Sequence, residues 1–166
     1  MIGYHSYLPT RSAEYPDSVA EAAIVKQMMK KPDSYYFELT DRSPITAFTE
    51  YLNAKGIAYD PEELRQEALR YNTILSDLKD YYNRPRPSQV SDIIPQKSST
   101  ADTPSYPSGH AFQAYILADY LGRKHLLHYF AFRRIANRIA NARVRAGLHY
   151  PSDNRSARQL ADHFLR

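Results

Sequence analysis

Three short segments in the second half of this 166-residue chain gather residues that can bind an anion and move a proton. The first segment runs from Lys79 to Pro87 and contains two further cations, Arg84 and Arg86, each followed by a proline. A residue before proline is pushed out of helical conformation, so both arginines are expected on an extended path after a helix that ends near Asn83 and has Lys79 in its last turn. The segment therefore holds two or three cations in a short space.

The second segment runs from Ser105 to His110 and has the sequence Ser-Tyr-Pro-Ser-Gly-His. Its small residues and proline predict a tight turn that leads into the start of a helix. A helix start offers free backbone N–H groups and the positive end of the helix dipole, which together bind anions. Ser108 adds a hydroxyl group to this anion site, and His110 adds a proton that can titrate near neutral pH.

The third segment runs from Arg143 to Asp153, with His149 four residues before the aspartate. At this spacing across a helix start, a carboxylate can fix the tautomer of an imidazole, which is how a histidine nucleophile is oriented. Each segment taken alone has an ordinary structural explanation, because surface cations, turns and histidines near aspartates are common. The order of all three favours a functional interpretation.

The spacing Lys-x6-Arg-Pro, then Pro-Ser-Gly-His, then Arg-x5-His-x3-Asp resembles the three-part signature of the type 2 phosphatidic acid phosphatase and vanadium haloperoxidase superfamily. The resemblance covers residues 79–153 and is greatest to the soluble class A bacterial nonspecific acid phosphatases, whereas residues 1–78 resemble no family that we recognise. Ala142 stands where that superfamily usually has a serine. We therefore expect one supporting hydrogen bond at the anion site to be missing, with a loss of activity as one outcome.

The resemblance implies a set of phosphate ligands. Three cations and the predicted helix start at Ser108 would hold the phosphoryl oxygens: Lys79, Arg86, Arg143, the Ser108 hydroxyl and the Gly109 amide. Such preorganised donors stabilise the charge that spreads over the equatorial oxygens during phosphoryl transfer. They would supply the positive charge that a metal ion supplies in other phosphatases, so neither a metal nor a cofactor is expected. Arg84 and Arg145 are near-duplicates of two of these ligands, and family spacing alone selects against them.

The resemblance also implies the catalytic roles. His149 would attack phosphorus in line and form a phosphohistidine, while Asp153 holds its other ring nitrogen. His110 would protonate the leaving oxygen and then activate water, which favours mildly acidic pH. His125 and His128 lie three residues apart, but no third metal ligand is near them in the sequence.

The predicted function is that of a metal-independent phosphatase for phosphomonoesters, with pyrophosphate and nucleotides left open as substrates. Vanadate is expected as an inhibitor. In the rival haloperoxidase interpretation, vanadate is the cofactor and His149 coordinates it. A lipid phosphatase at a membrane surface is a third interpretation. A fourth interpretation belongs to another functional class. In it, the protein is a non-catalytic binder of anions or nucleic acid that uses five arginines: Arg133, Arg134, Arg138, Arg143 and Arg145. That binder leaves the two histidines and the aspartate unexplained, so no nucleic-acid partner is expected.

Helices must position these residues, because apolar side chains recur at helical spacing and no stretch alternates as a strand does. We predict an all-α, single-domain bundle of about six helices over residues 17–30, 43–56, 60–83, 109–120, 125–146 and 152–165. Val19, Ala23, Ile24 and Met28 form the expected core stripe of the first helix. Residues 87–107, rich in Ser, Thr, Asp and Pro, form a long connection that we expect to wall or cover a site.

Composition narrows the classes of protein that fit. The chain has no cysteine, which excludes disulfides and a cysteine nucleophile, and no glycine-rich nucleotide loop. Residues 123–166 hold ten Lys and Arg against two acids, which favours an anionic partner. A mean hydropathy of -0.62 and the absence of a long apolar run predict a soluble protein without membrane spans. Residues 1–6 lack the features of a secretory signal, so the protein is expected to be cytoplasmic as written, or periplasmic or secreted if a signal was removed. The oligomeric state stays open, a homodimer included.

Overall fold

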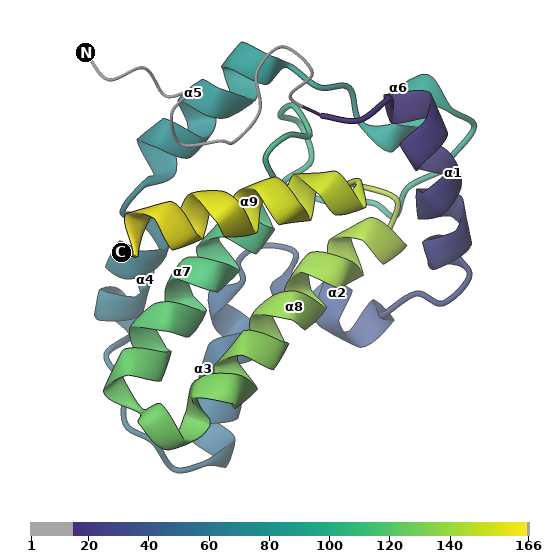
Figure 1. Ribbon diagram of the computed structural model, residues 1–166. Coiled ribbons are helices and arrows are strands. Elements are labelled where there is room, and N and C mark those ends of the chain that lie inside the picture. The colour runs from purple at the N-terminus through teal and green to yellow at the C-terminus, as the bar shows by residue number, and fades with distance from the viewer. Residues whose placement is uncertain (1–14, 166) are drawn as a thin grey trace.

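Three long helices form the centre of the fold and carry or directly flank the residues of the second and third motifs (Figure 1). They are α7 (Gly109–Lys124), α8 (Tyr129–Arg145) and α9 (Pro151–Phe164). The computed structural model describes residues 15–165. Helices α7 and α8 are joined by a 3-10 turn at Leu126–His128 and run side by side, and α9 lies across both.

Six further α-helices surround this centre in the described part of the chain. They are α1 (Ser18–Met29), α2 (Ser34–Thr40), α3 (Ile45–Ala54), α4 (Pro61–Leu69), α5 (Asn72–Tyr82) and the short α6 (Pro87–Val90). No strand occurs among residues 15–165, so the all-α prediction is confirmed. Helices α1, α2 and α3 pack against α8, while α4 packs against α7.

Local sequence explains where several of these helices begin. The carboxylates of Asp17, Asp33 and Asp60 accept hydrogen bonds from backbone N–H groups in the first turns of α1, α2 and α4. Pro61 then occupies the first position of α4, where a missing N–H costs nothing. Ser108 caps α7 in the same way through the N–H of Ala111, at 3.3 Å.

The structure divides the helix expected over residues 60–83 into α4 and α5. The break falls at Tyr71, whose backbone leaves the helical region with φ -112° and ψ 19°. Its ring stacks on Phe164 of α9, with ring centroids 4.3 Å apart. Packing against α9 therefore overrides the helical periodicity at this point. Residues 34–40 add a helix that the sequence did not predict.

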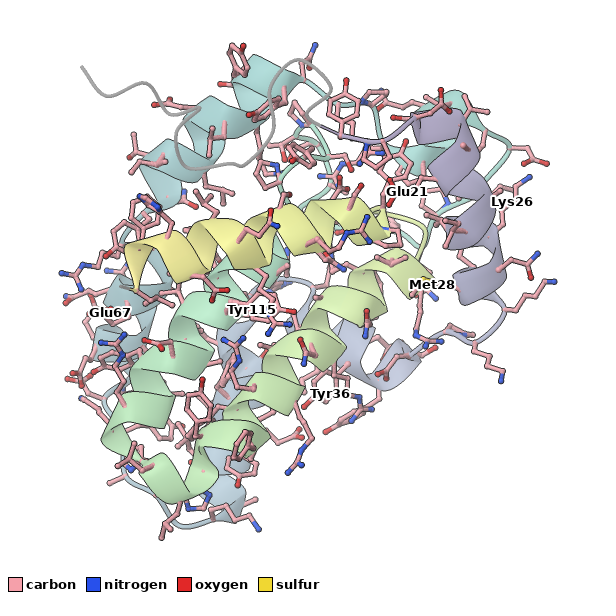
Figure 2. All side chains as sticks on the ribbon, viewed as in Figure 1. Glu21, Lys26, Met28, Tyr36, Glu67 and Tyr115 are labelled. Carbon is pink, nitrogen blue, oxygen red and sulfur yellow. The ribbon has the colours of Figure 1, made fainter. Side chains whose placement is uncertain are left out.

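The expected core stripe of the first helix is wrong except at Met28, which packs against a buried cluster. Val19 and Ile24 are 64% and 53% exposed, whereas the buried face of α1 holds Glu21, Ala22 and Val25. Figure 2 shows Glu21 on the side of α1 that faces the start of α9. A buried carboxylate needs compensating partners. Those partners belong to the candidate site.

Candidate active site

The three motifs meet at one pocket of about 230 Å³ beside the start of α7. Five of the eight residues singled out from the sequence line it: Lys79, Arg86, Gly109, His110 and His149. The other three lie directly around these five, as their hydrogen bonds show below. Lys79 and His149, which are 70 positions apart in the chain, thereby line the same pocket.

His149 is almost fully buried and has a defined tautomer. An Arg86 Nη1 lies 2.9 Å from Nε2 of His149, and because a guanidinium can only donate, Nε2 must accept. Nδ1 then carries the proton and donates it to Oδ2 of Asp153 at 2.9 Å. Burial and the charge of Arg86 lower the pKa of His149 well below its ordinary value. The imidazole is therefore neutral, with a lone pair on the nitrogen nearest to Arg86.

Asp153 is completely buried and accepts hydrogen bonds at both carboxylate oxygens. Oδ2 also accepts from the Tyr150 N–H at 3.0 Å and from the Ser105 hydroxyl. Oδ1 accepts from Nη1 of Arg84 at 2.9 Å. Burial raises the pKa of Asp153 to about 6, against the lowering effect of Arg84. These hydrogen bonds hold the Asp153 carboxylate in place, and the carboxylate in turn orients the imidazole of His149.

Arg84 and Arg86, which the sequence could separate only by family spacing, have different surroundings. The Arg84 side chain is fully buried and sits 3.7 Å above the ring of Tyr150. It bridges two carboxylates, Asp153 and Glu21, each at 2.9 Å. Arg86 instead points Nη1 at His149. The structure thus gives Arg84 a supporting position and Arg86 a position at the pocket.

Glu21 is the carboxylate that α1 buries, at 4% exposure. Its Oε2 accepts from Arg84 Nη2 and, at 2.6 Å, from the Ser152 hydroxyl. Its Oε1 accepts from the Ser152 N–H at 2.8 Å. All three hydrogen bonds come from Arg84 and Ser152, which lie around Asp153. Helix α1 therefore adds a second carboxylate to the buried network beneath the pocket.

Lys79 and Arg86 supply positive charge to the pocket. Lys79 Nζ donates to the Pro104 carbonyl at 2.6 Å, and Arg86 also donates to the Thr103 and Leu148 carbonyls. Burial, reinforced by Arg86, lowers the pKa of Lys79 to about 7. Burial likewise lowers the pKa of Arg86 to about 10. A cation that is buried without a counterion is energetically costly, so Lys79 and Arg86 favour the binding of an anion in this pocket.

The start of α7 faces the same pocket. Ser108 is fully buried, and its N–H donates to the Asp153 carbonyl at 3.1 Å, which couples this helix start to α9. Gly109 follows as the first helical residue, and a Cβ at this position would contact the Lys79 side chain at 3.7 Å. The first-turn N–H groups of α7 therefore lie next to the lysine, as an anion site requires.

His110 is held by the turn between α2 and α3. Its Nε2 lies 2.8 Å from the Asp41 carbonyl oxygen, so Nε2 carries a proton and donates it. Burial and the nearby Arg143 lower the pKa of His110 to about 3. This imidazole is therefore neutral at mildly acidic pH.

Arg143 is also buried, but much of its guanidinium is engaged. Nη1 donates to Oδ1 of Asp41 at 2.7 Å, while Nη2 donates to the hydroxyls of Ser98 and Thr100 at 3.3 Å. Its Nε has no hydrogen-bond partner within the described part of the chain. Thr100 lines the pocket, so Arg143 lies just behind that wall. Its near-duplicate Arg145 points elsewhere and donates to the Lys31 carbonyl.

Three residues at the site were missed by sequence reasoning: Glu21, Asp41 and Arg42. Arg42 lines the pocket from the turn between α2 and α3. Of these three residues, only Glu21 could have been noticed in the sequence, because this acid lies beside the apolar stripe of the first helix. The other two lie in an unremarkable loop far from the motifs.

The long connection over residues 87–107 does wall the site, as expected. Thr100 and Thr103 line the pocket, and the carbonyls of Thr103 and Pro104 hold the two cations. Ala142, at the position of the usual serine, is buried in the main core.

The arginines of the binder interpretation do not act as one set. Arg134, Arg138 and Arg145 share a surface depression on α8. Arg143 is buried at the pocket, and Arg138 pairs with Asp33. Over residues 15–165 there is no cluster of three His, Cys, Asp or Glu suited to a metal ion. Nor is any helix in that range long and apolar enough to span a membrane.

A comparison with protein families finds a match. A model described as the PAP2 superfamily matches residues 68–158, which is more than half of the chain. The match runs from the end of α4 into α9 and contains all eight residues singled out from the motifs. A search of curated proteins finds no match. The similarity to the class A acid phosphatases in particular stays a prediction.

Proposed function

Because the chain belongs to the PAP2 superfamily, which includes phosphatases, we propose that it hydrolyses phosphomonoesters through a phosphohistidine on His149. The observation that carries the proposal is the pairing of His149 with buried Asp153, which leaves the Nε2 lone pair beside Arg86. A surface or purely structural histidine needs neither a buried carboxylate nor three neighbouring cations.

Binding comes first in the proposed reaction. Lys79 and Arg86 now donate to backbone carbonyls and to His149. A phosphate dianion would take over some of these hydrogen bonds and those of the α7 start, and the free Nε of Arg143 is one more donor near the pocket. A dianion also raises the lowered pKa of Lys79, which strengthens its own binding.

Attack by Nε2 of His149 then forms a P–N bond while the bond to the leaving oxygen breaks. Negative charge spreads over the equatorial oxygens, where the cations and backbone N–H groups stabilise it. Positive charge develops on the imidazole, and the hydrogen bond from Nδ1 to Asp153 stabilises it. Arg84 and the other donors hold that carboxylate in place throughout.

Proton transfer is assigned to His110. Its pKa of about 3 is too low for a proton donor at mildly acidic pH. Bound phosphate adds negative charge beside the imidazole, which raises this pKa toward the working range. After the leaving group departs, His110 in its neutral form accepts a proton from the water that attacks phosphorus.

The experiment is hydrolysis of p-nitrophenyl phosphate in excess EDTA, followed by titration with vanadate. We expect EDTA to leave turnover intact, because cationic side chains supply the charge for which other phosphatases use a metal ion. Vanadate should inhibit competitively, since its five-coordinate form resembles the transition state. Loss of all turnover in EDTA, or inhibition no stronger than that by sulfate, would contradict the proposal. Peroxide-dependent bromide oxidation with vanadate, in place of phosphate release, would instead favour the haloperoxidase interpretation.

A further inference from the structure

Several polar side chains that line the pocket have no role in the proposed reaction. They are Arg42, Asn72, Ser76 and Gln113. Arg42 is exposed, and within residues 15–165 no hydrogen bond or ion pair occupies its guanidinium. By contrast, Asn72 accepts a long hydrogen bond from Gln113, at 3.4 Å. Arg42 is therefore a cation at the pocket that is open to a ligand.

The backbone before Arg42 is anchored to the catalytic centre. The carboxylate of Asp41 accepts from Arg143 Nη1 at 2.7 Å and from the Ser99 N–H at 3.1 Å. Its carbonyl oxygen accepts from His110 Nε2 at 2.8 Å and from the Thr100 hydroxyl at 3.2 Å. Although burial opposes the effect, hydrogen bonds from Ser98 and Arg143 lower the pKa of Asp41 to about 2, so the anchor is charged.

This anchor brings Arg42 near His110, the proposed proton donor. His110 is the group assigned to protonate the leaving oxygen, and it binds the residue directly before Arg42. The leaving group must depart toward His110. Arg42 lines the same pocket as His110 and directly follows the residue that His110 binds, so we place it beside the space that the leaving group enters.

The pocket itself is small. Its volume of about 230 Å³ lies below the roughly 300–1,000 Å³ of most small-molecule sites. A compact substrate fits such a space better than one with a bulky buried leaving group. A positive charge at its leaving-group end favours a compact substrate with a second negative charge.

We propose that Arg42 binds a phosphate leaving group and that the pocket prefers diphosphates, of which inorganic pyrophosphate is the smallest. The inference rests on the proposed function, because it assigns a substrate class to the same site. His149 Nε2 attacks one phosphorus as the bridging P–O bond breaks. The bridging oxygen leaves within orthophosphate, with the electron pair of that bond and the proton of His110. Water then hydrolyses the P–N bond and releases a second orthophosphate.

The test compares kcat/KM for inorganic pyrophosphate with that for p-nitrophenyl phosphate, whose leaving group lacks a phosphate. Arg42→Gln should lower the ratio of the two values roughly 10- to 100-fold, the range of one charge-assisted hydrogen bond. Arg42→Lys should retain most of the ratio. Lys55→Gln, which removes the same charge from an exposed site after α3, should leave the ratio unchanged.

Each outcome decides the matter. A ratio in Arg42→Gln within twofold of the wild-type ratio would overturn the role of Arg42. A wild-type protein that hydrolyses p-nitrophenyl phosphate but not pyrophosphate would overturn the substrate class and leave the proposed function standing. Failure on both substrates would overturn the two together. An equal fall of the ratio in Lys55→Gln would show a general effect of charge and would also count against the inference.

Discussion

Glu21 of α1 and Asp153 of α9 accept hydrogen bonds from the same buried guanidinium, that of Arg84, each at 2.9 Å. Two carboxylates thus share one cation directly beneath His149. Glu21 lies outside the segment that matches the PAP2 superfamily, whereas Arg84 and Asp153 lie inside it. The first helix of the chain is therefore part of the electrostatic support of the site.

The first prediction concerns the stability that this shared cation provides. Glu21→Gln keeps the shape of the side chain but removes its charge, which leaves Arg84 with one carboxylate instead of two. Removing one partner of a buried ion pair costs about 3–5 kcal/mol. We expect a loss of about that size in the free energy of unfolding, measured by urea denaturation.

Glu38→Gln is the matched control, because Glu38 is exposed on α2. It should change the free energy of unfolding by less than about 0.5 kcal/mol. Equal effects of the two substitutions would show that the buried network around Arg84 contributes no special stability.

The second prediction separates the two neighbouring arginines. Arg86→Ala should lower kcat/KM for p-nitrophenyl phosphate by about 10²- to 10³-fold, the cost of removing one donor to a transition-state oxyanion. Arg84→Ala should instead lower the free energy of unfolding by about 3–5 kcal/mol, because it leaves Glu21 and Asp153 buried without their cation. Steady-state kinetics and urea denaturation of both variants provide the comparison. A reversed pattern, with the folding defect in Arg86→Ala alone, would refute the assignment.

The third prediction concerns pH. His110 has a pKa of about 3 in the folded protein, below its ordinary value of 6.5, because burial and Arg143 disfavour the charged form. Between these two values the unfolded chain binds a proton there and the folded chain does not. Stability is therefore fully present above about pH 6.5 and declines as the pH falls toward 3, by at most about 1.4 kcal/mol per unit for this group.

Urea denaturation at pH 7, 6, 5 and 4 measures this decline. His110→Gln should lose less stability than the wild-type protein over the same range, because its side chain cannot titrate. His125→Gln, at the end of α7, serves as the control. A decline in His110→Gln that parallels the wild-type decline would show that His110 is not the group responsible.

The motif-bearing half of the fold was predictable because its signals are local. Ser108 caps α7 through the next turn of its own helix, and His149 binds an aspartate four residues away. Prolines mark the extended path of Arg84 and Arg86. In these cases, each signal and its structural consequence lie within one turn or one loop.

The other features of the fold and of the site depend on contacts between residues far apart in the chain. Asp41 pairs with Arg143, and Glu21 pairs with Arg84, but neither acid belongs to a motif. The apolar spacing of α1 favours Val19 and Ile24 as core residues, yet the buried ion pair of Glu21 turns the opposite face inward. Likewise, the helix over residues 60–83 breaks where Tyr71 meets Phe164. The spacing of apolar residues along one helix contains no information about such contacts with distant residues.

The central claim is that His149 forms the covalent intermediate. The most direct measurement is a rapid alkaline quench during turnover of a phosphomonoester, followed by mass spectrometry of the peptides, since phosphohistidine survives base but not acid. We predict phosphate on His149 in the wild-type protein and its absence in His149→Ala, together with loss of the initial burst of p-nitrophenol. Phosphate on another residue, or an undiminished burst in His149→Ala, would contradict the mechanism.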